Sequence, residues 1–254
     1  DLSSAAPDDG WSGGNVSPGV RLDVGLSQQA SLHVASRYTR IDGDLDLQAL
    51  IGLSPDGSTA LRYHYREIST WDEYQTDGFA TTTARTGGIE HKLVGGVEAG
   101  FSTTDSQIGV GPAASLDIDD PDYGPPPSAP VLSPTRFNVT RVGFYATDQM
   151  RLGKSVTVVP GLRWSHIDVD DKVAAATKPG ATESASTESI VSPNIGIVVL
   201  PRPWFSLYSS YTQGFEPPAP GQYLENGLAP ELSEARSFEA GAKAGLMGQR
   251  ISVT

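Results

Sequence analysis

Apolar and polar residues alternate with a period of two along several stretches of the chain. The stretches with the most regular alternation are 93–101, 156–166 and 238–246. One set of alternate positions is apolar, whereas the other carries glycine and isolated charges such as Glu98 and Arg163. Because successive side chains of a strand point to opposite faces of its sheet, this pattern predicts strands with one apolar face. Helical periodicity is scarce, so the sequence predicts an all-β protein.

Turn-forming residues divide the chain into about ten expected strands. These lie near 18–26, 30–41, 60–85, 88–102, 137–150, 155–169, 189–200, 204–214, 235–246 and 249–254. Short connections alternate with long polar ones, which are expected at 42–58, 103–136, 170–188 and 215–234. Transmembrane β-barrels have short periplasmic turns and long extracellular loops, so this alternation predicts an antiparallel transmembrane barrel. A soluble β-sandwich would also alternate along its strands, but it needs no alternation of connection lengths.

Aromatic residues support the membrane interpretation, because they gather near the ends of the expected strands. They are Tyr38, Tyr63, Tyr65, Phe101, Trp164, Trp204, Phe205 and Tyr211. Transmembrane barrels carry girdles of aromatic side chains at both membrane interfaces. No apolar run approaches the ~20 residues of a membrane-spanning helix. The sequence therefore favours a protein that crosses the membrane with strands.

Composition and motifs remove several other classes of protein. The 254-residue chain has no cysteine, which excludes a thiolate metal site, and its net charge of −12 argues against nucleic-acid binding. The four histidines do not form an H-E-x-x-H motif, and no G-x-S-x-G motif is present. The acidic run from Asp117 to Asp122 lacks the spacing of an EF-hand; a solvated loop is expected, with Ca²⁺ binding as the alternative. We expect no catalytic and no metal-ligating residue.

Four pieces of the chain carry motifs that follow one another in a recognisable order. The first is I-E-H-K-L-V-G-G-V-E from Ile89. The second is G-F-Y-A-T-D-Q-M-R-L from Gly143 with V-P-G-L-R-W-S-H-I-D. The third is S-P-N-I-G from Ser192 with P-W-F-S-L-Y-S-S-Y-T-Q-G-F-E-P-P, and the fourth is L-A-P-E-L-S-E-A-R-S-F-E-A-G-A-K from Leu228. Together they resemble the barrel of TonB-dependent siderophore receptors, whose hairpin Y-x-Q-D-x-x-x-L … G-L-R-x-D is similar to the second piece. The resemblance covers about 88–254 well and 1–87 more loosely.

The resemblance implies a fold, a place in the cell and a domain organisation. The chain is expected to form about ten strands of a larger barrel, which has 22 strands in this family, in the outer membrane of a Gram-negative bacterium. Residues 1–254 would be one partial barrel domain, without the family's plug domain and TonB box. A smaller complete barrel of ten strands is the structural alternative.

The resemblance also implies a function, which is uptake of ferric siderophores energised through TonB. The implied partners are the ferric siderophore, outer-membrane lipid and the TonB–ExbB–ExbD complex, acting through the missing plug region; nucleic acid is not among them. No cofactor is expected, because iron would arrive inside the siderophore. The alternatives are a receptor for another cargo such as cobalamin or an oligosaccharide, a small non-transport barrel, an outer-membrane enzyme, and a soluble binding sandwich.

Two groups of side chains are candidates for this function. Charged residues on the non-lipid face would face the lumen, where they could contact a plug: Glu98, Arg141, Arg163, Glu239 and Lys243. An arginine or lysine facing lipid at the membrane midplane would cost about 2–4 kcal/mol, which favours the lumen. Aromatic residues in or near the long loops are candidates for binding a bulky chelate: Trp71, Tyr74, Tyr123, Phe215 and Tyr223.

Overall fold

The computed structural model describes residues 9–123, 127–128, 130–173, 182–216, 231–246 and 251–253. The long strands are β3 (Ala30–Leu53), β4 (Thr59–Thr86), β5 (Ile89–Pro112), β7 (Ser133–Leu152), β8 (Val156–Val173) and β9 (Thr182–Arg202). The shorter ones are β1 (Gly10–Val16), β2 (Gly19–Gly25), β6 (Leu116–Asp117), β10 (Phe205–Glu216), β11 (Ser233–Leu246) and β12 (Ile251–Val253). All twelve belong to one sheet, and every strand pairing is antiparallel.

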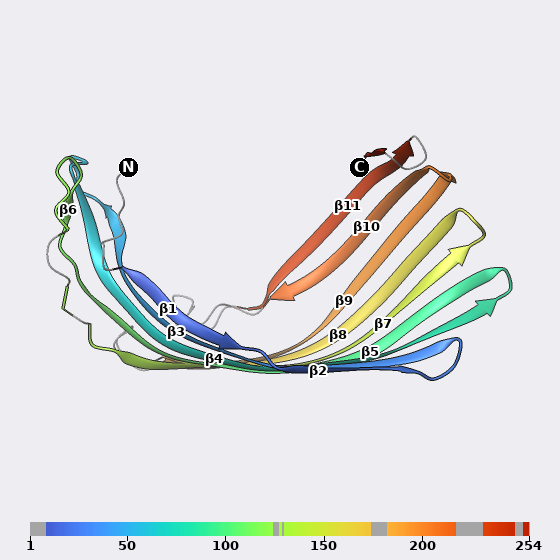
Figure 1. Cartoon of the computed structure of the whole chain (residues 1–254), viewed down its shortest axis with the longest axis horizontal. Helices are drawn as coiled ribbons and strands as arrows, with labels where there is room; N and C mark the ends of the chain where they lie inside the picture. The colour runs from blue at the N-terminus through green and yellow to red at the C-terminus, as the bar shows by residue number, and fades with distance from the viewer. Residues whose placement is uncertain are drawn as a thin grey trace.

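The strands follow one another across the sheet in the order β1-β3-β4-β5-β7-β8-β9-β10-β11-β12. β1 and β2 pair in succession with the two halves of β3, so together they form one edge strand, interrupted at Ser17 and Pro18. Proline has no N–H to donate to a ladder, which explains the interruption. Figure 1 shows a strongly curved, open surface, with the long ends of β3, β4 and β5 rising on one side and β10 and β11 on the other. The predicted all-β antiparallel fold is confirmed.

The sheet has two ends that differ in their connections. At one end, called the turn end, the connections are 26–29, 87–88, 153–155 and 203–204, and Gly87 and Gly153 have the positive φ angles of tight turns, 60° and 65°. At the opposite end, called the loop end, the connections include 54–58 and 113–132. Among the described residues, no helix has the length and apolar content needed to cross a membrane.

The register divides the side chains between two faces of the sheet. Glu98 of β5 pairs with Asp77 of β4 and Gly143 of β7, and the face that carries them is called the inner face. The opposite, outer face carries large apolar side chains that are exposed: Leu93, Val97, Phe101, Phe144, Leu162, Trp164, Val191, Ile195, Ile197, Leu207 and Phe238. An exposed apolar band on one face of a sheet is the surface that a transmembrane barrel presents to lipid.

The strands extend much further at the loop end than the sequence predicts. The expected long connection at 42–58 is wrong, because β3 continues to Leu53 and the connection is the five-residue turn at 54–58. Likewise, β5 continues to Pro112 and β9 begins at Thr182, inside two further segments expected to be loops. The polar composition of these extensions resembles that of a loop, since neither face of a strand outside the membrane needs to be apolar.

The turn at 54–58 is closed by one carboxylate. Oδ1 of Asp56 accepts hydrogen bonds from the Ser54 hydroxyl at 2.5 Å, the Ser58 hydroxyl at 2.9 Å and the Ser58 N–H at 3.2 Å. These donors favour the ionised carboxylate, led by the Ser54 hydroxyl, and lower the pKa of Asp56 to about 2. This depressed pKa makes the turn sensitive to acid.

We expect the turn to keep its full stability from neutral pH down to about pH 4, and to lose it as the pH falls through about 2. The sign follows because a carboxyl whose pKa is lowered on folding stabilises the folded state only above its unfolded pKa of about 3.8. Hydrogen exchange of the Gly57 amide across this pH range measures the effect after correction for intrinsic exchange. Asp56→Asn is the control and should show no pH-dependent step. A step centred near pH 4 in the unaltered protein would contradict the prediction.

Candidate functional site

The inner face carries a band of long polar side chains that lie flat along the sheet. Arg163 of β8 lies across Gly143 of β7, and its Nη1 donates to Glu98 Oε2 of β5 at 3.2 Å. A Cβ on Gly143 would lie 2.7 Å from Nη2 of Arg163, so only glycine leaves room for this crossing. The ion pair therefore joins two strands that are not neighbours.

The same arrangement occurs twice more on β7. Arg141 lies across Gly100 of β5 and donates to Glu73 of β4. The Tyr145 ring covers Gly96 of β5, and its hydroxyl donates to Asp77 Oδ2 of β4 at 2.8 Å. In each case a glycine on the intervening strand lets a long side chain stay close to the wall. The band is polar and internally paired, and its side chains do not stand upright from the sheet.

The register also places the remaining two charged candidates on the inner face, on β11. Glu239 accepts a hydrogen bond of 3.2 Å from the Tyr208 hydroxyl, and Lys243 Nζ lies 5.5 Å from the centroid of the same ring. All five charged candidates, Glu98, Arg141, Arg163, Glu239 and Lys243, thus share one face of the sheet.

A cavity of about 360 Å³ opens on the inner face beside this band. Its lining includes Glu98, Arg141, Arg163, Ser192 and Phe215. The pairing of β10 with β9 ends where Thr212 meets Asn194, whereas its pairing with β11 continues to Glu216. Beyond Thr212, β10 is not paired with β9, and Phe215 is among the residues that line the cavity there.

The polarity of the two faces is exchanged at the loop end. Beyond the rung on which the Tyr38 and Tyr74 rings meet at 4.7 Å, the outer face becomes charged, with Arg40, Asp42, Asp44, Asp46, His64, Arg66, Asp72, Asp105 and Arg136. The inner face of the same extensions becomes apolar and aromatic, with Trp11, Ile41, Leu45, Leu47, Tyr63, Tyr65, Trp71, Ile108 and Val110. Among them, Glu67 accepts bonds from the Tyr65 hydroxyl at 2.7 Å and the Ser106 hydroxyl at 3.1 Å. This exchange marks the edge of the lipid band.

The aromatic candidates fall in different environments. The prediction that Trp71 and Tyr74 lie in or near a loop is wrong, because both lie within β4. Trp71 pairs with Ile41 and Thr104 and lies on the inner face. Tyr74 is 59% exposed on the outer face, beside Tyr38, which is the position of a lipid-interface aromatic.

The remaining tyrosine predictions complete the comparison. Tyr123 places its ring 5.6 Å from the Arg62 guanidinium carbon, on the outer side of β4. Tyr223 lies outside the described residues. Tyr63 and Tyr65, expected in a girdle, belong to the inner wall of the loop end, because their strand continues past the lipid band.

Sequence reasoning missed a segment that folds back over the outer side of the loop end. This segment, called the 113–131 strap, is described at 113–123, 127–128 and 130–131. Leu116 of β6 pairs with Ala60 of β4 and is fully buried. The Ala114 carbonyl accepts a bond of 2.9 Å from Nε of the buried Arg62. The strap therefore covers the charged outer face of β4.

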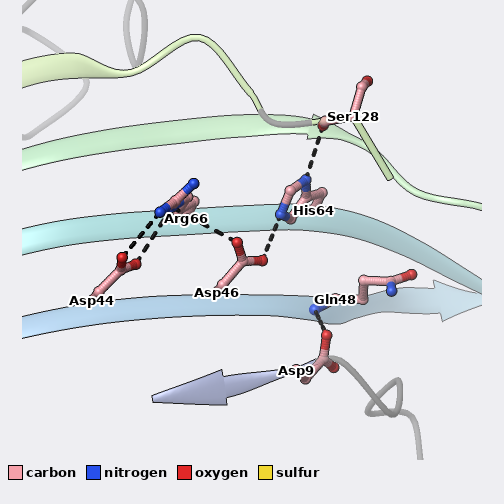
Figure 2. Close-up of polar contacts among 7 residues, drawn as sticks. All are labelled: Asp9, Asp44, Asp46, Gln48, His64, Arg66 and Ser128. Atoms are coloured by element: carbon pink, nitrogen blue, oxygen red, sulfur yellow. Dashed lines mark hydrogen bonds and ion pairs between the residues drawn. The ribbon is translucent and has the colours of Figure 1, made fainter. Parts of the chain in front are cut away.

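A histidine joins the strap to the charged outer face, as Figure 2 shows. His64 Nδ1 lies 3.2 Å from the Ser128 carbonyl oxygen, and its Nε2 lies 2.7 Å from Asp46 Oδ1. Arg66 bonds Asp44 at 2.9 Å and approaches Asp46 at 3.7 Å, which extends the network along β3. Because His64 is buried, these contacts fix the strap to both strands.

A Ser–His–Asp array lies on the inner face near the turn end. His33 Nδ1 bonds Asp23, and His33 Nε2 lies 3.0 Å from the Ser31 hydroxyl. The Ser31 hydroxyl also lies 2.6 Å from that of Thr81, and Ser31 is paired on both sides within the sheet. Acyl transfer needs free N–H donors aimed at a developing oxyanion, whereas the backbone N–H groups around Ser31 serve the strand ladder. This array is therefore better explained as a structural network.

Replacing Gly143 by valine should separate Arg163 from Glu98. The new side chain would occupy the path of the guanidinium, whose flexible end can move without disturbing the backbone. We expect a loss of about 0.2–1 kcal/mol in the free energy of unfolding, as for a partly exposed ion pair. Unfolding of the full-length protein in lipid vesicles measures it, with Gly95→Val as the control, since a Cβ there meets nothing nearer than 3.9 Å. In the Gly143→Val background, Glu98→Gln should cost almost nothing more; an additive loss would contradict the crossing contact.

Comparison with known proteins identifies the family. The family model described as TonB dependent receptor-like, beta-barrel matches residues 2–254. The metal-pseudopaline receptor CntO of Pseudomonas aeruginosa strain UCBPP-PA14 is 28% identical over 261 aligned positions, which cover 98% of this chain and 36% of the relative. The chain therefore spans little more than a third of that relative's length.

Solved structures show the same fold. The siderophore receptor PiuA from Acinetobacter baumannii superposes with a TM-score of 0.84 at 17% identity, covering 96% of this chain and 39% of PiuA. The closed form of the ferric-catecholate import receptor Fiu from E. coli K12 superposes with a TM-score of 0.83 at 16% identity, covering 98% of this chain and 40% of Fiu. The chain belongs to the β-barrel family of TonB-dependent receptors, which are transport receptors of the Gram-negative outer membrane.

Proposed function

We propose that this chain is part of the wall of an outer-membrane receptor that imports metal chelates, with ferric siderophores as its cargo. The observation that carries the proposal is the change along the inner face. At the loop end, which is extracellular in this family, the inner wall is aromatic and apolar around Trp71. Within the lipid band, the same face is polar and internally paired, as at Arg163 and Glu98. An aromatic vestibule above a polar passage suits capture and then entry of a bulky, hydrophilic chelate.

The related protein named a metal-pseudopaline receptor supports a metal chelate as the cargo class. The partners in this proposal are a ferric siderophore, outer-membrane lipid against the apolar band, and the TonB–ExbB–ExbD complex acting through a plug. A receptor for cobalamin or an oligosaccharide is the second candidate, since an aromatic wall also suits a corrin or a sugar ring.

Uptake by the full-length protein tests the proposal. The protein is expressed in a strain that lacks its own siderophore receptors, and entry of ⁵⁵Fe is measured with ferric enterobactin, ferrichrome, ferric citrate and ferric pseudopaline. We expect saturable uptake of at least one chelate, lost in a TonB-deficient strain. Uptake of cobalamin or maltodextrin without any iron uptake would replace the proposal by the second candidate. No uptake of any of these probes would overturn both.

Trp71→Ala should weaken binding of the transported chelate about 3- to 10-fold, because an aromatic contact contributes about 0.5–1.5 kcal/mol beyond the area it buries. Titration of the purified full-length receptor with the chelate measures the Kd. Tyr74→Ala is the matched control, since Tyr74 lies three positions along the same strand on the outer face. Equal losses in the two variants, or none in either, would contradict a ligand-binding role for Trp71.

A further inference from the structure

A carboxylate lies within the aromatic part of the inner face at the loop end. Trp11 of β1, Leu45 of β3 and Glu67 of β4 form one rung of the sheet, and their side chains are directed to the inner face. Oε2 of Glu67 accepts a bond of 2.7 Å from the Tyr65 hydroxyl, and its Oε1 accepts one of 3.1 Å from the Ser106 hydroxyl. The two bonds hold this carboxylate in one place on the wall, on the same rung as an indole ring.

The indole ring of Trp11 extends across the glycines of two strands. A Cβ on Gly13 of β1 would lie 2.9 Å from Cζ2 of the indole. A Cβ on Gly43 of β3 would lie 3.2 Å from the indole Nε1 and 3.6 Å from Oγ of Ser69 on β4. The ring therefore reaches across β3 toward Ser69, which follows Glu67 on the inner face of β4. Trp11 is 63% exposed, so its ring is open to contact from the lumen.

The basic side chains described at the loop end lie on the outer face. They include Arg40, Arg62, Arg66 and Arg136. In the described part of the chain, no lysine or arginine lies on the inner face beyond the rung that holds Arg141. The carboxylates on the inner face there include Glu67 and Asp171, which lies on the rung of Trp71. This part of the inner face is therefore acidic as well as aromatic.

We propose that the chelate imported by this receptor carries a protonated amine, which binds between the Trp11 indole and the Glu67 carboxylate. The inference rests on the proposed function and names the charge class of its cargo. An ammonium group is attracted by the face of an aromatic ring, and most strongly by an indole. A nearby carboxylate adds a charge-assisted hydrogen bond. An anionic chelate would find no basic partner on this part of the wall, and Glu67 and Asp171 would repel it.

Two chelates that differ in a single charge test the proposal. Ferrioxamine B ends in a primary ammonium group, and acetylation of that group gives a neutral chelate with the same iron-binding groups. The Kd of each chelate is measured with the purified full-length receptor at low and high salt. We expect the receptor to bind ferrioxamine B about 10-fold more tightly than the acetylated chelate, with a smaller preference at high salt.

Variants of Glu67 assign this preference to one carboxylate. Glu67→Gln should remove most of the preference by weakening the binding of ferrioxamine B alone, and an unchanged Kd for the acetylated chelate shows that the variant is folded. Glu67→Asp should keep much of the preference, because the charge remains. Glu183→Gln is the matched control, since Glu183 lies on the outer face at the same end and pairs with Lys172. It should leave the preference unchanged.

The outcomes separate this inference from the proposed function. Equal affinities for the two chelates, or a preference that survives in Glu67→Gln, would overturn the inference. Uptake of ferric enterobactin, which is anionic, by a receptor that does not bind ferrioxamine B would also overturn it, whereas import of metal chelates would stand. Uptake of no chelate at all would overturn the proposed function and the inference together.

Discussion

Replacing Leu162 by arginine is expected to destabilise the folded barrel by about 2–4 kcal/mol, the cost of a lipid-facing arginine near the midplane. Leu162 is 53% exposed on the outer face of β8, between Ala146 and Pro193 on the neighbouring strands. Its outward neighbours along β8 include Val158 and Trp164, so it lies within the apolar band. Unfolding of the full-length receptor in lipid vesicles, with guanidinium as the denaturant, measures the loss.

Two control variants separate the effect of membrane depth from the loss of the leucine side chain and from the added charge itself. Leu162→Ala removes the same side chain without adding charge, and should cost much less because Leu162 is half exposed. Thr187→Arg adds the same charge on the outer face at the edge of the band, because Thr187 pairs with Asp168 on the rung that also holds Tyr74. Near the membrane interface this charge should cost about 0–1 kcal/mol. Equal costs for the two arginine variants would mean that the exchange of polarity does not mark the edge of the membrane.

The sequence predicts the strands well only where the two faces of the sheet meet different surroundings. Between 156 and 166, lipid requires apolar residues on one face and the lumen accepts polar residues on the other, so alternation is visible. The alternation in 93–101 has the same origin and predicts correctly which side chains of β5 share a face. These segments carry part of the apolar band and two of the five charged inner candidates, Glu98 and Arg163.

The sequence does not predict the strand extensions at the loop end. There the contrast between an apolar outer face and a polar inner face disappears and then reverses. In 42–47 the aspartates fall on the outer face and Leu45 and Leu47 on the inner face, whereas a barrel pattern expects the opposite. The sequence of this segment therefore predicts a polar loop. The register of β3 against β4 is what assigns Asp44 and Leu45 to opposite sides.

The contacts that build the candidate site are also beyond a reading of the sequence. Arg163 and Glu98 are 65 positions apart in the sequence and meet across a third strand. In the sequence, Gly143 is only a glycine inside an expected strand, and nothing marks it as part of a contact. Only the pairing of three strands shows that this glycine makes room for a guanidinium. The sequence predicts that these charged residues face the lumen, because a charge that faces lipid is costly. It does not predict which residues they pair with.

Replacing Leu116 by alanine is expected to release the 113–131 strap. Leu116 is fully buried against β4, and shortening a buried leucine to alanine typically costs about 2–5 kcal/mol. The strap is joined to β4 by a ladder of only two residue pairs, so the loss falls on its local attachment and not on the barrel. We expect limited proteolysis to cleave the strap much faster in this variant, while the unfolding midpoint of the barrel stays unchanged.

Release of the strap should also expose the buried charged groups beneath it. Arg62 and His64 contact the strap through the carbonyl groups of Ala114 and Ser128, so the backbone amides of β4 near them should exchange faster in the Leu116→Ala variant. Val131→Ala is the matched control, because Val131 lies at the end of the strap but is 82% exposed, and its truncation should change neither cleavage nor exchange. A lower unfolding midpoint without faster cleavage would show that the strap is an integral part of the barrel wall, held by more than the Leu116 contact.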